Sequence, residues 1–117
     1  MKAVAAPAPT ERLWEVVVGL RDAGIGPGSP VAILGRKGEH EFWARVGRIR
    51  IIAQIPDPDA FLHADPAVQE QVLDALARTG AMALVGNDWA ASHRGQAWQH
   101  LGASRYYAVD LAGRARR

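Results

Sequence analysis

An unbroken apolar run at residues 31–34 constrains the fold of this chain more than any other feature. Glycine and proline residues fill positions 26–30 before it, and a basic pair flanked by glycines follows it at positions 35–38. A short apolar run bounded by turn residues is typical of a strand buried on both faces between helices. We therefore expect residues 31–34 to form the inner strand of a small sheet.

Helix-like and strand-like patterns alternate along the rest of the chain. Helices are expected where apolar residues recur three and four positions apart, and strands where β-branched and apolar residues run together. Such alternation implies parallel strands joined by right-handed crossovers. The expected helices span residues 10–23, 39–46, 66–78 and 96–101, the expected strands span residues 31–34, 48–55, 81–85 and 106–111, and residues 57–64 are expected to form a loop.

These elements predict an α/β fold: a three-layer sandwich with a small, mostly parallel sheet that corresponds to half of a Rossmann-like fold. The expected strand order is 2-1-3, with the fourth strand at one edge. A length of 117 residues fits one domain, which we place at residues 10–112. Residues 1–9 are rich in alanine and proline and indicate a linker or a cut end, and residues 113–117 indicate a frayed basic tail.

Each long helix has an apolar stripe that we expect to face the sheet. In the second helix Gly47 is expected to end the stripe, and in the first Gly24 is expected to close the helix. The strand at 48–55 begins by alternating arginine and isoleucine, which indicates one partly exposed end. The expected inward residues are Leu13, Val16, Val17 and Leu20, then Phe42, Trp43 and Val46, and finally Val68, Val72, Ala75 and Leu76.

Composition excludes several kinds of protein. The chain has no cysteine, which excludes disulfides and thiolate metal sites. No run approaches the roughly 18 apolar residues that a membrane span needs, and the first residues lack the apolar centre of a signal peptide. The net charge is +2, but Arg114, Arg116 and Arg117 are three of the 14 cationic residues, which leaves 11 against 12 acidic ones. The body is nearly neutral, so we expect no nucleic-acid partner.

The turn formed by Gly35, Arg36, Lys37 and Gly38 is the first candidate site. It joins a buried strand to the start of a helix, where backbone N–H groups and two cations favour an anion. Glycines also serve any tight strand-to-helix turn without a ligand. Neither the G-x-G-x-x-G pattern nor the G-x-x-x-x-G-K-[ST] pattern is present, so both interpretations stay open.

In strand order 2-1-3 the switch point lies between the first and third strands. It brings the glycine turn beside the loop that follows residue 85, so Asn87, Asp88 and His93 are the second half of the candidate site, with Trp89 as a stacking wall. This site would take a small anionic ligand or a nucleotide.

We predict no catalytic residue, no metal ligand and no cofactor. Ser92 and His93 are neighbours in sequence, and no G-x-S-x-G turn is present. The histidines show neither the H-x-x-x-H nor the H-E-x-x-H spacing that places two ligands on one helical face.

Two resemblances to known families extend this interpretation. Residues 20–35 resemble the early helix–turn–strand of adenylate-forming enzymes, where a phrase of the form GI-x-PG-x-x-VAI occurs, but the Ser/Thr/Gly-rich ATP loop of that family is missing. A wider resemblance covers nearly the whole body, through residues 25–28, 42–55, 80–85, 97–102 and 106–107. These segments are similar to the soluble C-terminal part of multi-pass bacterial membrane proteins of glycosyltransferase-like type. Ser29 and Gln54 stand where acids are more usual in that pattern.

The wider resemblance implies a non-catalytic accessory or interaction domain. Its partner would be the remainder of a bacterial membrane protein in the same chain, which would tether it to a membrane. The alternative function is binding of a small anion or nucleotide at the edge formed by the carboxyl ends of the strands.

Overall fold

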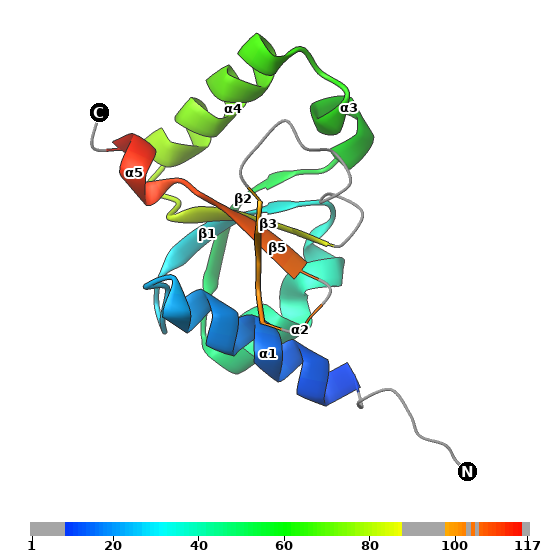
Figure 1. Cartoon of the computed structure of the whole chain (residues 1–117), viewed down its shortest axis with the longest axis vertical. Helices are drawn as coiled ribbons and strands as arrows, with labels where there is room; N and C mark the ends of the chain where they lie inside the picture. Colours follow the sequence, from blue (N-terminus) through cyan, green and yellow to red (C-terminus); the bar gives the residue numbers. More distant parts are fainter. Residues whose placement is uncertain (1–8, 88–97, 103, 105, 116–117) are drawn as a thin grey trace.

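A computed structural model of the chain describes residues 9–87, 98–102, 104 and 106–115. A central sheet separates two helical layers: α1 and α2 cover one face, and α3 and α4 cover the other, with α5 beside α4 (Figure 1). The helices are α1 (Pro9–Asp22), α2 (Lys37–Gly47), α3 (Pro58–Leu62), α4 (Pro66–Arg78) and α5 (Ala112–Ala115); the strands are β1 (Pro30–Leu34), β2 (Arg50–Ile55), β3 (Ala83–Asn87), β4 (Gln99–His100) and β5 (Tyr106–Asp110). The predicted three-layer α/β architecture is confirmed.

The sheet has the strand order β2-β1-β3-β5-β4. Strands β2, β1 and β3 are parallel, as expected, whereas β5 is antiparallel to both β3 and β4. The connection from β1 to β2 runs to one side of β1, and the connection from β2 to β3 runs back to the other side. Two crossovers of the same hand that run in opposite directions place their helices on opposite faces of the sheet, here α2 on one face and α3 and α4 on the other. The fourth predicted strand is β5, and its predicted place at the edge is wrong, because β5 lies between β3 and the two-residue strand β4, which pairs outside it.

Strand β1 is the centre of the core. Its residues alternate between the two faces: Val31 and Ile33 pack under α1 and α2, whereas Ala32 and Leu34 pack under α3 and α4. All four side chains are at most 1% exposed. Complete burial of one large aliphatic side chain contributes about 1.5–3 kcal/mol, so this strand holds both helical layers to the sheet.

Helix α1 buries three of the four residues predicted to face inward, and the side chain of the fourth, Leu13, lies outside the described part of the structure. Val16, Val17 and Leu20 are buried, and the N–H of Ile25 donates to the carbonyl of Leu20 at 2.8 Å. Gly24 adopts the left-handed φ of 87° that lets the chain turn back, and Ile25 then packs into the core. The predicted end of this helix is confirmed.

Helix α2 faces the sheet with a different stripe from the predicted one. Phe42 and Val46 are 56% and 42% exposed, so their predicted burial is wrong. Gly47 is not the cap: it lies inside the helix, where a Cβ would be 3.1 Å from Val17, and Arg48 takes the left-handed cap position with φ 57°. Close packing on α1 therefore selects the stripe of small and aromatic residues: His40, Trp43, Ala44 and Gly47.

The predicted loop at 57–64 contains the short helix α3, which the Asp57 side chain caps by accepting from the Ala60 N–H at 3.2 Å. Helix α4 has the predicted bounds and buries Leu76 as expected. However, Ala75 is exposed and Val68 is 44% exposed, so their predicted burial is wrong.

The buried face of α4 differs from the predicted one because Gln69 of α4 makes a buried polar contact with α3. The Gln69 amide donates to the carbonyls of Phe61 and Leu62 at 2.9 and 3.2 Å. These bonds satisfy backbone acceptors at the end of α3 that burial would otherwise leave unpaired. The inward residues of α4 are consequently Gln69, Leu73, Leu76 and Ala77.

The helix predicted at 96–101 is wrong, because residues 99–100 form β4. The pairing of β4 with β5 is closed by the hydroxyl of Ser104, which donates to the Leu101 carbonyl at 2.6 Å and accepts from the Tyr106 N–H at 3.1 Å. A two-residue strand has no periodicity of its own, so tertiary pairing decides its structure.

The prediction of a frayed tail at residues 113–117 is also wrong for Arg114, which lies in α5. Its guanidinium binds the carboxylates of Glu70 and Asp74 on α4 at 2.9 and 3.0 Å. The hydrogen bond to Glu70 is the main cause of the raised pKa of Arg114. The end of the described chain is thus fastened to α4.

Candidate functional site

The two halves of the predicted site meet at the carboxyl ends of β1 and β3. Ala32 pairs with Leu84 and Ile33 with Val85, and this register continued by two residues places Gly35 beside Asn87. Gly35 has a φ of 114°, a conformation that favours glycine. The glycine turn and Asn87 therefore lie together at the switch point, whereas Asp88 and His93 lie outside the described residues.

The turn leads directly into the N-terminus of α2. Arg36 is the N-cap residue, with extended φ and ψ of −87° and 147°, and its own side chain makes no capping hydrogen bond. Arg36, Lys37 and Gly38 are exposed. A helix N-terminus with two exposed cations has the electrostatic character that favours an anion.

A buried cluster of aromatic rings, His40, Trp43 and Tyr106, connects α2 to the end of β1 just before this turn. The Trp43 indole N–H donates to His40 Nδ1 at 3.3 Å, so the imidazole proton is on Nε2, which donates to the Leu34 carbonyl at 3.0 Å. The Tyr106 ring packs edge-on against both rings, with centroids 5.6 and 6.2 Å away. His40 is fully buried, and its bonds fix α2 to the end of β1. Its role is to position the turn.

Asn87 contributes the one polar group of the described site that is buried without a partner. It pairs with Tyr106 across the β3–β5 ladder, so both side chains project to the face covered by α1 and α2. Asn87 Oδ1 has no hydrogen-bond partner in the described structure. A carbonyl oxygen in this state favours a donor such as a hydroxyl group.

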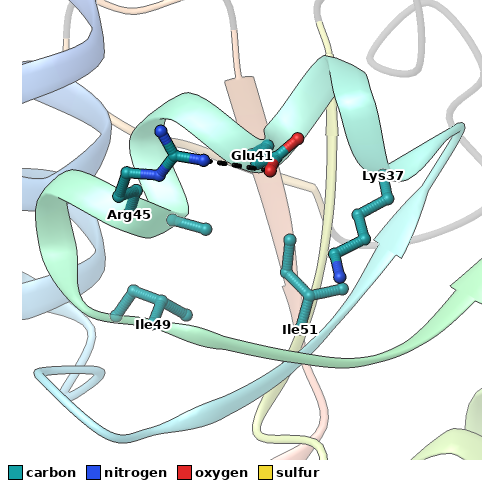
Figure 2. A pocket seen from close by; sticks show the side chains of 6 residues that line it. Lys37, Glu41, Arg45, Ile49 and Ile51 are labelled. Carbon is teal, nitrogen blue, oxygen red and sulfur yellow. Dashed lines mark hydrogen bonds and ion pairs between the residues drawn. The ribbon is translucent and has the colours of Figure 1, made fainter.

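A second candidate site lies between α2 and β2. It is a cavity of about 210 Å³ with an apolar floor of Ala44, Ile49 and Ile51, and Figure 2 shows Ile49 and Ile51 below the charged residues of α2. Lys37 lies at one end of the cavity, and Arg45 at the other forms an ion pair with Glu41 at 3.1 Å. Helix α2 supplies the charged wall and Ala44, and the start of β2 with the residue before it supplies Ile51 and Ile49.

This cavity runs beside an open edge of the sheet. Strand β2 is the last strand on its side, and its six residues alternate between exposed and half-buried. Val31 pairs with Ile51 but Ala32 pairs with Ala53, so Ile52 is an extra residue and is 40% exposed. A bulge of this kind turns the following residues over: Ile51 packs under α2, whereas Ala53 packs under α4.

This second site was not predicted from the sequence. Two signals in the sequence point toward it: the arginine–isoleucine alternation at the start of β2, and the i, i+4 spacing of Glu41 and Arg45. Neither signal shows that α2 and the outer side of β2 lie next to each other, because that depends on the strand order.

The described residues contain no group of three histidine, cysteine, aspartate or glutamate side chains that would hold a metal ion. None of the helices in the same part of the chain combines the length and apolar character that a bilayer crossing needs.

Comparisons with known proteins give no relative for this chain: no family model, no curated protein and no solved structure matches it.

Proposed function

We propose that this chain is a non-catalytic interaction domain that binds its partner along the outer edge of β2 and in the adjoining cavity between α2 and β2. We call this cavity, lined by Lys37, Glu41, Ala44, Arg45, Ile49 and Ile51, the α2 groove. The observation that carries this proposal is the half-exposed six-residue edge strand beside a cavity of about 210 Å³ that has an apolar floor and a charged wall. Unpaired strand edges invite aggregation, and proteins usually shorten or cover them. A strand edge without a neighbouring strand in the described structure, next to a cavity with an apolar floor, favours a partner that covers both.

The resemblance of residues 42–55 to parts of bacterial membrane proteins gives the proposal its setting. These residues include most of α2 and all of β2. We propose that the partner segment belongs to the remainder of such a protein, with this domain as its accessory part.

An unbiased library of linear peptides tests the proposal. Peptides selected on the folded domain are expected to shift the backbone amide resonances of α2 and β2. Ile52→Glu should weaken their binding by about tenfold or more, because a carboxylate then replaces the exposed aliphatic side chain at the centre of the edge. Val68→Glu is the matched control, since Val68 on α4 is similarly exposed, at 44% against 40%. Selected peptides that bind elsewhere, or equal losses with both variants, would contradict the proposal.

The carboxyl ends of β1 and β3 support a second candidate function, binding of a small ligand that has both an anionic group and a hydroxyl group, such as a phosphosugar or nucleotide. The anion would meet Arg36 and the N-terminus of α2, and the hydroxyl would satisfy Asn87 Oδ1. Calorimetric titration with nucleotides and phosphosugars tests it. Arg36→Ala should weaken binding by about tenfold, and an absence of binding at about millimolar ligand would exclude this function. Lys37→Ala is less selective, because Lys37 also lines the α2 groove.

A further inference from the structure

We infer that the partner at the β2 edge is an extended acidic segment that joins the sheet as an additional strand. This inference rests on the proposed function and adds to it the conformation and the charge of the partner. Three properties of the edge carry it: the direction of its backbone groups, the shape of the cavity and the sign of its charges.

The backbone of β2 has peptide groups that face away from the sheet. The Arg50 N–H donates to the Ser29 carbonyl, and the Ile55 carbonyl accepts from the Gly35 N–H, so these residues point toward β1. Neighbouring residues of a strand point their peptide groups to opposite sides. The groups of Ile51 and Gln54 consequently point outward, where an extended segment can pair with them.

The cavity fits a side chain projecting from such a segment. It lies on the α2 side of the edge, and its floor is aliphatic. Its volume of about 210 Å³ exceeds that of apolar cavities of about 150 Å³ that bind benzene. An added strand places every second side chain on this face, so an aliphatic side chain of the partner can occupy the cavity.

The charges of the edge are mainly positive. Lys37 and Arg45 lie on the α2 side, where Arg45 is paired with Glu41. Arg50 is exposed and projects to the other face, because its neighbours Ile49 and Ile51 both pack under α2. Arg48 is exposed as well. A segment added here meets cations on both of its faces, which favours carboxylate side chains among its aliphatic ones.

A second copy of the chain is a poorer occupant of this edge. Residues 48–56 contain two arginines and no acidic residue. Two such strands paired edge to edge would bring together like charges without carboxylates between them. The complementary partner is therefore a different, acidic segment.

Three peptide libraries of about eight residues test the inference on the folded chain. Each combines valine, isoleucine and leucine with one polar set: aspartate and glutamate, asparagine and glutamine, or lysine and arginine. We expect selection from the acidic library, with binding about tenfold or more tighter than for the matched amide peptides and weaker at high salt.

Strand addition is tested separately with Gln54→Pro. Proline removes an outward N–H, so the β1–β2 ladder stays intact while pairing with the peptide is lost. We expect this variant to fold and to lose peptide binding by about tenfold or more, whereas Gln54→Ala keeps it. Hydrogen exchange at the Gln54 amide of the unmodified chain should slow when the acidic peptide binds.

The outcomes separate this inference from the proposed function. Neutral or basic peptides at the β2 edge, or acidic peptides insensitive to Gln54→Pro, would overturn the inference and leave the interaction function standing. A dimer through β2 that excludes peptides would identify the second copy as occupant and also overturn it. A monomer that selects no peptide at this edge from any library would overturn both.

Discussion

The strands β1 and β2 are parallel neighbours, yet β1 is buried along nearly its whole length and β2 is half-exposed. Their sequences, Pro-Val-Ala-Ile-Leu and Arg-Ile-Ile-Ala-Gln-Ile, explain part of this contrast, because Arg50 and Gln54 are two of the three exposed residues of β2. Position in the strand order explains the rest: in the described part of the chain β1 has a strand on each side, whereas β2 has a strand on one side only. The outer side of β2, where Ile52 is 40% exposed, is the place at which we propose that a partner binds.

The other edge of the sheet is closed. Strand β4 has only two residues, and the turn that follows it packs on α1 so tightly that Gly19 and Gly102 are required. A Cβ at Gly19 would lie 2.7 Å from Leu101 Cα, and one at Gly102 would lie 2.8 Å from the Glu15 carbonyl oxygen. One edge is thus shortened and covered, whereas at the other edge no strand among the described residues pairs with the outer side of β2.

The largest expected effect is a loss of stability, and it tests the contrast between β1 and β2 with an isoleucine-to-alanine substitution in each strand. Ile33→Ala should destabilise the domain by about 2–5 kcal/mol, because Ile33 is fully buried and its loss leaves a cavity. Ile52→Ala, at a side chain that is 40% exposed, should cost less than about 1 kcal/mol. Urea unfolding of both variants measures the difference. Equal losses would show that β2 is as deeply buried as β1.

A smaller effect is expected at the closed edge. Gly19→Ala should destabilise the domain by about 1–3 kcal/mol, because the added methyl group collides with the backbone of Leu101. Gly38→Ala is the matched control in another helix: a Cβ there meets nothing within 4 Å, so stability should stay within about 1 kcal/mol or rise. Thermal unfolding decides between them. Unchanged stability of Gly19→Ala would mean that α1 does not close this edge.

The smallest expected effect is at Arg48, where one substitution should raise the stability of the fold and weaken peptide binding at the β2 edge. Arg48→Gly should stabilise the fold by about 1 kcal/mol, because a non-glycine residue is strained at its left-handed φ of 57°. The same change should weaken binding of acidic peptides, since a cation of the edge is lost. Arg48→Ala is the control: it should weaken binding equally without the gain in stability. Stabilisation by both variants would show that the strain is not in the backbone.

Much of the fold could be predicted from the sequence because its strong patterns are local. The residues that form β1 and the bounds of α4 were both recognisable, the former from an apolar run between turn residues and the latter from an Asp-Pro start and a glycine end. The strand order placed the glycine turn and Asn87 at one edge, as the structure has them. The faces of α2 and α4 were not predictable, since Gly47 on Val17 and the Gln69 amide on α3 decide them through contacts distant in sequence.

By itself, the sequence determined the class of fold, the central strand and the glycine turn after it. These depend on hydrophobic periodicity and on the backbone preferences of glycine and proline, which act over a few residues. The tertiary structure alone decided that the bulge at Ile52 divides the side chains of β2 between two faces and that α2 forms a groove with this strand. The physical reason is that a bulge and a groove depend on how segments distant in sequence pack together, whereas the order of the parallel strands follows from the alternation of helices and strands along the chain.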